Sequence, residues 1–178
     1  DLDNGKYTAQ DATTAQKGII QLSSATNSTS ETLAATPKAV KTAYDNAEKR
    51  LQKDQNGADI PGKDTFTKNI GACRAFGGSV STITGNWTTA QFIEWLDSQG
   101  AFNHPYWMCK GSWSYGNNKI ITDTDCGNIH LAGAVIEVMG IKSAMTIRIT
   151  TPTTSTGGGT TNAQFTYINH GTDYSPGW

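Results

Sequence analysis

The first third of the sequence has few of the residues that build a hydrophobic core. Only 36% of the 178 residues are hydrophobic, and the mean hydropathy is −0.46. Of the sixteen aromatic residues, only Tyr7 and Tyr44 precede residue 61. Folding needs enough buried apolar surface to offset the lost chain entropy, so residues 1–60 are not expected to fold alone as a globular domain. Residues 61–178 contain the other fourteen aromatic residues and are expected to form a compact core.

The sequence also lacks an excess of either charge and any long hydrophobic run. Seven Lys and Arg stand against eight acidic residues in the first sixty positions, and seven against seven in the rest, for a net charge of −1. Because no basic patch is visible, a nucleic-acid partner is not expected. No run of eighteen apolar residues occurs, so we expect no membrane insertion. The sequence begins at Asp1 without a Met or a signal-like segment, which indicates a fragment or a processed product.

Cysteine is scarce, and its spacing fits neither a metal motif nor a disulfide framework. Cys73, Cys109 and Cys126 are separated by 36 and 17 positions. We expect three reduced, partly buried thiols, which favours folding in a reducing compartment.

A helix is predicted in the first part of the chain, after a short strand within Lys17–Ser23. Thr36 can act as its N-cap, and Pro37 stands at the first helical position, where a missing N–H group costs nothing. We expect this helix to continue to about Lys53.

The apolar residues of this helix follow steps of four, three and four positions, the spacing of a coiled-coil seam: Val40, Tyr44, Ala47 and Leu51. The seam is narrow, and a single helix of this kind would be marginally stable in water. We therefore interpret residues 1–60 as an oligomeric stalk in which copies pack around an axis. The alternative is a lone helix lying on the globular part.

A Gly- and Pro-containing segment, Gln55–Phe66, places the domain change near residue 60. A second helix is predicted at about 89–99, because Thr88 and Gln91 form a capping box and Gly100 supplies a stop. Its apolar residues Phe92, Trp95 and Leu96 are assigned to packing.

The remaining segments have the period of strands. Residues 105–124 predict a strand, a turn and a strand, and further strands are expected within 128–140, 143–151 and 162–170. In one of them Met145, Ile147 and Ile149 should face the core. A hairpin at 140–143 should set Glu137 near Arg148 on the solvent face. The predicted fold is mainly β with some α: a stalk of strand and helix, then an antiparallel β-sandwich-like head, residues 61–178, with one helix.

No enzymatic motif is present around His104, His130 or His170. Asp123 and Asp125 could form a glycosidase pair only if the fold opposed them across a sugar. If the chain is trimeric, His130 or His170 from each chain could meet on the axis as metal ligands, but a lone histidine is more often just hydrogen-bonded. We therefore expect no enzyme, no metal and no cofactor.

Residues suited to carbohydrate gather between 103 and 119. Trp and Tyr stack on the apolar C–H faces of sugars, while Asn, His and Lys bind hydroxyl groups, and an anionic glycan phosphate would favour Lys110 or Lys119. Alternation must send about half of this segment inward. The candidate receptor-binding residues are His104, Tyr106, Trp107, Trp113, Tyr115, Asn117, Asn118 and Lys119.

Two stretches resemble a known family. Ala12–Asp45 resembles the tail-fibre repeat of contractile-tailed bacteriophages, and Gly127–Trp178 resembles the tip of Mu-type phage tail fibres. The resemblance implies a homotrimeric fibre in the virion, made in the host cytoplasm, whose distal domain binds host lipopolysaccharide. It also implies a fibre-assembly chaperone that engages the end of the chain. Such fibres generally extend a little further, so we expect that a short polar tail is missing. The residues that match the family ending are Asp173, Tyr174, Ser175, Pro176, Gly177 and Trp178.

The sequence thus predicts a phage receptor-binding fibre protein. Two other functions stay open. One is a depolymerase that cleaves surface polysaccharide, and the other is a shaft segment without receptor contact.

Overall fold

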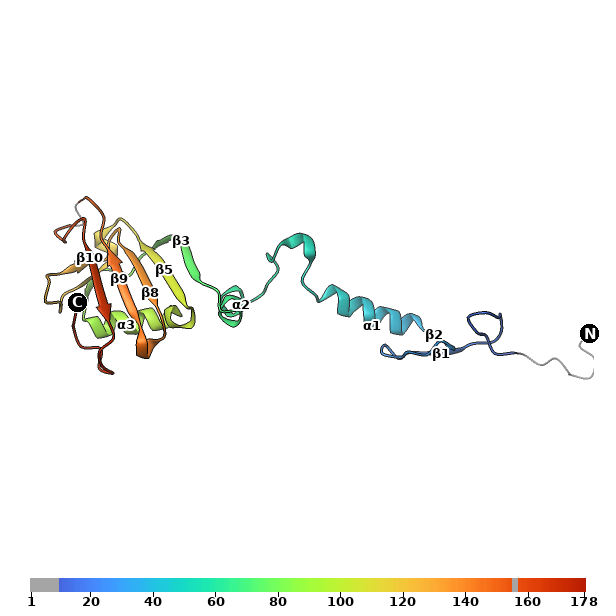
Figure 1. The fold of residues 1–178 in the computed structure, drawn as a ribbon. Helices are drawn as coiled ribbons and strands as arrows, with labels where there is room; N and C mark the ends of the chain where they lie inside the picture. Colours follow the sequence, from blue (N-terminus) through green and yellow to red (C-terminus); the bar gives the residue numbers. More distant parts are fainter. Residues whose placement is uncertain (1–9, 155–156) are drawn as a thin grey trace, which may run out of the picture. The chain divides into compact units, whose positions relative to one another are not determined.

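The computed structural model describes residues 10–154 and 157–178, with no description of the side chains of residues 76–78 and 115. The chain divides into two compact units, Asp1–Pro61 and Gly62–Trp178, hereafter the N-terminal and the C-terminal unit. Figure 1 labels their elements. The fold is mainly β with some α, as predicted.

The N-terminal unit is built from a parallel strand pair and one helix. Strand β1 (Gln21–Ser23) pairs with β2 (Leu33–Ala35), and α1 (Pro37–Glu48) follows directly. A short 3-10 helix, η2 (Lys53–Gln55), comes after it. The predicted helix start is confirmed, because the Thr36 side chain accepts a hydrogen bond from the Ala39 backbone N–H at 3.1 Å.

The end of α1 differs from the prediction. The helix stops at Glu48 rather than near Lys53, so Leu51 lies outside it. Beyond the helix, the backbone N–H of Gln52 donates to the Asp59 carboxylate at 2.6 Å. A local carboxylate therefore takes the place of the next helical hydrogen bond.

The described residues of the C-terminal unit form two sheets and two α-helices. The five-stranded sheet has the order β10-β9-β8-β5-β3, and the three-stranded sheet has the order β4-β6-β7. The strands are β3 (Arg74–Val80), β4 (Gly85–Trp87), β5 (Tyr106–Gly111), β6 (Lys119–Ile121), β7 (Ile129–His130), β8 (Val135–Met139), β9 (Thr146–Thr150) and β10 (Gln164–Ile168). The helices are α2 (Lys63–Asn69) and α3 (Thr89–Ser98), with 3-10 turns η3 (Ala101–Asn103), η4 (Tyr115–Asn117) and η5 (Lys142–Ala144).

Strand pairing departs from the predicted pattern in three ways. The pairs β3·β5 and β4·β6 are parallel rather than antiparallel. The two strands expected within 105–124, β5 and β6, join different sheets. The single strand expected within 128–140 is divided into β7 and β8 by a turn at Ala132–Gly133, where Gly133 has a φ of +67°. Only glycine adopts this conformation without steric cost, so the turn is specified locally.

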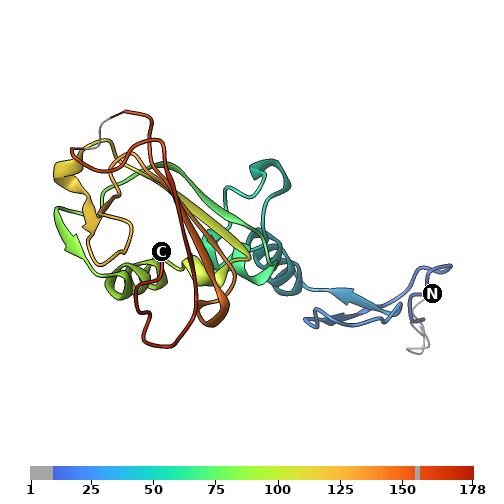
Figure 2. The ribbon, with the colours of Figure 1, turned by 60° about the vertical axis from the view of Figure 1, so that its left-hand side comes forward.

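Helix α3 supplies one side of the core and the five-stranded sheet supplies the other, as the two ribbon views show (Figures 1 and 2). The predicted capping box is present: Gln91 N–H bonds the Thr88 hydroxyl, and the Gln91 side chain bonds the Thr88 N–H. Phe92 and Leu96 are fully buried, and Trp95 packs partly buried against them. The predicted inward residues of β9 are likewise buried: Met145 just before it, and Ile147 and Ile149 within it.

The three cysteines are free thiols. Cys109 is buried in the core, and burial raises its pKa to about 12. Cys73 and Cys126 are exposed rather than partly buried: Cys73 directly precedes β3, and Cys126 lies in a turn between β6 and β7.

Candidate functional site

Among the candidate receptor-binding residues whose side chains the structure describes, Trp113 is the one with a large, exposed hydrophobic side chain. Its side chain is 61% exposed, and its ring packs against the backbone of Gly133. A Cβ atom added at Gly133 would lie 3.1 Å from Cε3 of Trp113 and 3.3 Å from Cγ of Pro152. The indole therefore lies directly on the Gly133 backbone, and a side chain there would displace it.

Lys110 stands beside the Trp113 ring. Its Nζ lies 5.4 Å from the ring centroid, within the range of a cation–π contact, and it also donates to the Gly133 carbonyl. An aromatic face with a fixed cation next to it can accept an apolar sugar face and an adjacent anionic group together.

Asn118 is buried and holds the loop that carries Trp113. Its side-chain Nδ2 donates to the Ser112 carbonyl at 3.1 Å, the Ser112 hydroxyl at 2.6 Å and the Ser114 carbonyl at 2.8 Å. Its Oδ1 accepts from the N–H and the hydroxyl of Thr82 at 3.3 and 3.2 Å. Because both ends of the amide are satisfied, the loop 112–118 and the loop 81–84 form one framework.

Lys119 lies at the border of this framework and packs across Trp87. Its Nζ donates to the Thr84 carbonyl at 2.7 Å and lies 5.6 Å from the Trp87 ring. Neighbouring Asn117 is exposed. The side chain of Tyr115 is outside the described part of the structure.

Three of the predicted surface residues are in the interior, so the predicted surface placement is wrong for them. The exposures of His104, Trp107 and Asn118 are 3%, 1% and 2%. Trp107 points inward because alternation along β5 sends it to the helix-covered face, where its ring meets Trp95 edge-on at 6.5 Å.

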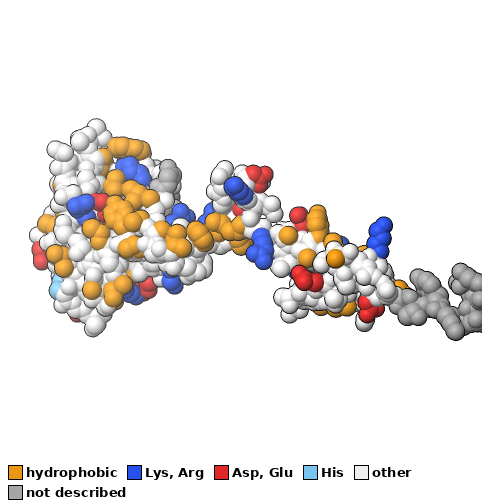
Figure 3. Space-filling view, turned by 45° about the vertical axis from the view of Figure 1, so that its right-hand side comes forward, with side chains coloured by type: hydrophobic (Ala, Val, Ile, Leu, Met, Phe, Trp, Pro, Cys, Tyr) orange, Lys and Arg blue, Asp and Glu red, His pale blue; other side chains and the backbone are white. Residues whose placement is uncertain are grey.

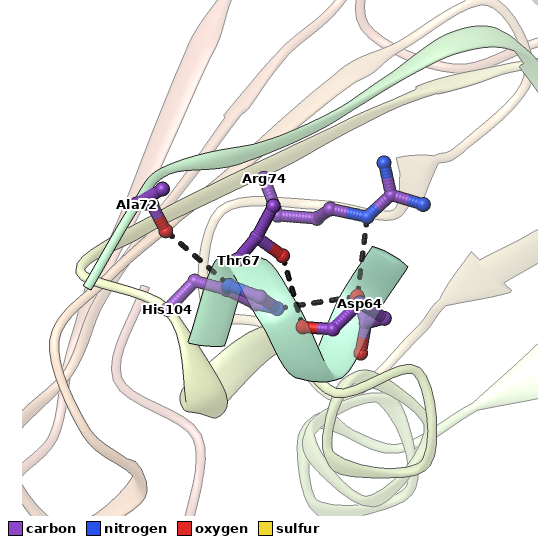
Figure 4. A network of polar contacts seen from close by, with 5 residues as sticks. All are labelled: Asp64, Thr67, Ala72, Arg74 and His104. Atoms are coloured by element: carbon purple, nitrogen blue, oxygen red, sulfur yellow. Dashed lines mark hydrogen bonds and ion pairs between the residues drawn. The ribbon is translucent and has the colours of Figure 1, made fainter. Parts of the chain in front are cut away.

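His104 is buried by a polar network that attaches α2 to the sheet (Figure 4). Its Nε2 lies 3.3 Å from the Asp64 carboxylate, and its Nδ1 lies 3.3 Å from the Ala72 carbonyl oxygen. Arg74 Nε donates to the same carboxylate oxygen of Asp64 at 3.1 Å. The ring therefore connects elements of the fold, and sequence reasoning missed this because α2 was not predicted.

Tyr106 is half-buried and belongs to a row of polar side chains across three strands. Its hydroxyl donates to Glu137 at 2.7 Å, and Arg148 donates to the same carboxylate through Nε at 2.8 Å and Nη2 at 3.0 Å. The hydrogen bonds from Arg148 lower the pKa of Glu137, and the bond to Glu137 raises the pKa of Tyr106. The predicted proximity of Glu137 and Arg148 is confirmed.

Asp123 and Asp125, the two carboxylates considered as a glycosidase pair, have different surroundings: Asp123 is hydrogen-bonded to α3, and Asp125 is exposed. Asp123 accepts from both the N–H and the hydroxyl of Thr89 at 2.8 Å, and thereby caps the first turn of α3. Asp125 is exposed in the following turn. Within the described residues there is no group of three His, Cys, Asp or Glu side chains that could hold a metal ion.

The last six residues pack against the same unit. Trp178 donates from Nε1 to the Thr89 hydroxyl at 2.8 Å, and its ring lies 5.3 Å from Tyr167 and 6.2 Å from Phe92. Tyr167 in turn donates to the Ser175 carbonyl at 2.9 Å. In this chain the segment Asp173–Trp178 therefore closes one side of the core next to α3.

Gly133 and Pro152, which lie against Trp113, were absent from the predicted site, and so was Ile83, whose N–H bonds the loop that carries Trp113. Lys110 was considered only for a glycan phosphate and was not among the candidate receptor-binding residues. The sequence held a signal for one of them, because Gly133 interrupts an otherwise strand-like run. Ile83 and Pro152 come from segments distant in sequence, which only the folded chain brings next to loop 112–118 and Gly133.

Comparison with known proteins identifies the class. Residues 13–54 match the family model of the phage tail fibre repeat. The chain is 75% identical over 131 residues to tail fiber protein S' of Escherichia phage Mu, an alignment that covers 72% of this chain and 40% of that protein. It is also 73% identical over 45 residues to the major tail fiber protein S of Escherichia phage P1, covering 25% of this chain and 18% of that protein. The protein is therefore a phage tail fibre protein.

More particularly, it is of the Mu type, since tail fiber protein S of Escherichia phage Mu also matches, with 64% identity over 61 residues, 34% of this chain and 12% of that protein. The chain spans 40% of the length of the first of these relatives. Such a protein is a component of the virion. None of the helices in the described residues is long and apolar enough to cross a membrane.

Proposed function

We propose that the C-terminal unit attaches the virion to a glycan of the host cell surface, lipopolysaccharide, during adsorption. The observation that carries this proposal is Trp113, an indole that is 61% exposed and yet fixed on the Gly133 backbone beside Lys110. An aromatic side chain held rigidly in water costs little further entropy when a ligand stacks on it. Binding is then the simplest reason for its position.

The neighbouring groups suit a phosphorylated sugar. Lys110 and Lys119 supply positive charge on either side of loop 112–118, and exposed Asn117 supplies a donor and an acceptor for hydroxyl groups. The ligand that fits is a sugar ring stacked on Trp113 with an anionic group near a lysine.

We propose that three copies of the chain assemble through the N-terminal unit. Three of the four predicted seam residues are large, and in the single chain their exposures are 59% for Val40, 59% for Tyr44 and 55% for Leu51. In Figure 3, hydrophobic side chains reach the surface of this unit as well as the other. A homotrimer would cover the seam, and three linked heads would raise the avidity for a cell surface without any new contact.

The chaperone partner is assigned to Asp173–Trp178. Tyr174 and Trp178 are only partly buried, so a chaperone could cover the outer side of this segment while the fibre is assembled in the host cytoplasm. Trp178→Ala should then weaken chaperone binding as well as the packing on α3.

An enzymatic function is the second candidate, and no catalytic residue is proposed. A depolymerase would need opposed carboxylates, whereas Asp123 is engaged in capping α3. Incubation of the purified protein with lipopolysaccharide should leave the glycan length unchanged. Shorter products would establish the enzyme instead.

The test of attachment is the binding of the purified protein to lipopolysaccharides that are truncated stepwise through the outer core. We expect binding to be lost at one defined truncation, which would identify the sugar. Equal binding to every truncation would contradict a specific glycan. If adsorption to cells survives deletion of residues 62–178, the chain is a shaft segment without a receptor site.

A further inference from the structure

Ile83 has an unusual backbone conformation at an exposed position. Its φ is +68°, in the left-handed region, where a β-branched side chain is a genuine outlier. Its side chain is 69% exposed, more than any other large hydrophobic side chain of the described residues. Burial therefore offsets little of the strain, and strain of this kind concentrates at ligand contacts.

The conformation of Ile83 is imposed by its neighbours. Its N–H donates to the Asn117 carbonyl at 2.8 Å, while the preceding Thr82 is buried and bonded to Asn118. The Thr82 hydroxyl also accepts from the Lys119 N–H at 2.8 Å. Lys119 Nζ donates to the Thr84 carbonyl at 2.7 Å on the other side. These bonds hold the backbone on both sides of Ile83, and its side chain is exposed.

The same framework holds Trp113. Asn118 bonds Thr82 on one side and Ser112 on the other, and the Ser112 N–H donates to the Val80 carbonyl at 2.9 Å. Loop 81–84 and loop 112–118 are therefore joined at several points. Among their described side chains, Ile83 in the first loop and Trp113 in the second are large, hydrophobic and exposed.

We propose that Ile83 is a second glycan-contacting residue, which binds a methyl group of a sugar adjacent to the one on Trp113. The proposal rests on the glycan-binding function proposed above. Isoleucine offers no hydrogen bond, so at this point a glycan can be held only by an apolar group. The most apolar groups that sugars carry are the methyl groups of N-acetyl and 6-deoxy residues, and either would fit this chemistry.

The decisive variant is Ile83→Asn, because asparagine adopts the left-handed conformation readily. We expect its thermal midpoint to rise by about 2 °C or more as the strain is relieved. We also expect its affinity for the lipopolysaccharide that the parent chain binds to fall by about fivefold or more, the loss that removal of one buried hydrophobic contact produces. A stability gain together with an affinity loss separates binding from folding.

The matched control is Ile141→Asn, which removes the same side chain at an exposure of 61% on the turn between β8 and β9. Register places this turn beyond Met139, whereas loop 112–118 follows Gly111 at the other end of β5. We expect its affinity to be unchanged. If Ile83→Asn binds as tightly as the parent chain, Ile83 is not a contact and the inference fails, while the proposed attachment function stands. If the parent chain itself binds no lipopolysaccharide, the attachment function fails first.

The ligand class is tested by competition with soluble methyl glycosides. The methyl glycosides of N-acetylglucosamine and of rhamnose carry an additional methyl group on the sugar. They should displace lipopolysaccharide at a lower concentration than the methyl glycoside of glucose does. The advantage should disappear in Ile83→Asn. Equal competition by all three in the parent chain would overturn the assignment of a methyl group to Ile83.

Discussion

The contact between Glu137 and Arg148 shows which side-chain contacts can be predicted from the sequence. Strand alternation and a short turn predicted that the two would face each other, and the register of β8 and β9 confirms it. The sequence did not show that Tyr106 from β5 joins them, since β5 lies about thirty positions earlier and reaches Glu137 only through the sheet. Cross-strand partners within a hairpin are therefore predictable, and partners from remote strands are not.

The substitution Glu137→Gln should change the acid stability of the C-terminal unit. The pKa of Glu137 is lowered in the folded chain, so its contribution is present above the ordinary glutamate pKa of about 4.3 and is lost as the pH falls through the lowered value. The variant should be less stable than the parent at pH 7, and the difference should narrow as the pH falls below about 4. Urea unfolding across this range measures it. A difference that stays constant with pH would contradict the lowered pKa, and exposed Asp125→Asn serves as the control.

At the scale of elements, local sequence patterns predicted those features that depend on residues close together in the sequence, such as helix starts and the buried faces of strands. The capping box at Thr88 and Gln91 located the start of α3, and the alternation in 143–151 located the buried face of β9. The short helix α2 was not predicted, because it lacks a side-chain cap and has no buried residue of its own. It is attached to the fold by the bond between Asp64 and Arg74 and by the contact with His104.

The substitution Thr88→Ala tests the contribution of the capping box. Removing the hydroxyl leaves the Gln91 N–H without its partner, which should lower the free energy of unfolding by about 1 kcal/mol. Chemical denaturation followed by tryptophan fluorescence measures the change. The matched control is Thr122→Ala. Thr122 is exposed and bonds Trp87 through its backbone N–H, which alanine keeps, so we expect little effect on the free energy of unfolding. Equal losses in the two variants would mean that the cap is not the source of stability.

The candidate site was predictable in its residue types but not in its orientation. Eight positions between 103 and 119 were chosen for their chemistry, and the structure buries His104, Trp107 and Asn118 while it exposes Trp113. The periodicity of β5 does not say which of its two faces α3 covers. The contribution of Ile83 and Gly133 depends on contacts between separate loops, which no local pattern encodes.

At the scale of the whole molecule, the low hydrophobicity of the N-terminal unit agrees with a fibre. Ala39 is the only hydrophobic residue of α1 that is buried in the single chain. The apolar residues Ile19, Leu22, Val40 and Tyr44 are exposed. In the proposed trimer, other copies of the chain would cover them.

The double substitution Val40→Asp and Tyr44→Asp should abolish the proposed trimer. Two carboxylates on the seam would place six like charges around the axis, so sedimentation should show a monomer. Weaker attachment to whole cells should accompany it, because avidity is lost. Thr42→Asp, which adds a charge to the opposite side of α1, should leave the trimer intact. A trimer that persists in the double variant would show that assembly does not use this seam.

Attachment through Trp113 is tested most directly by the affinity of Trp113→Ala for the lipopolysaccharide that the parent chain binds. The indole is exposed, so the variant should keep its fold, and we expect a loss of about tenfold in affinity as the stacking contact disappears. Phe66→Ala removes another exposed aromatic side chain, from α2, and should bind like the parent. Full affinity in a correctly folded Trp113→Ala protein would contradict the proposed receptor site.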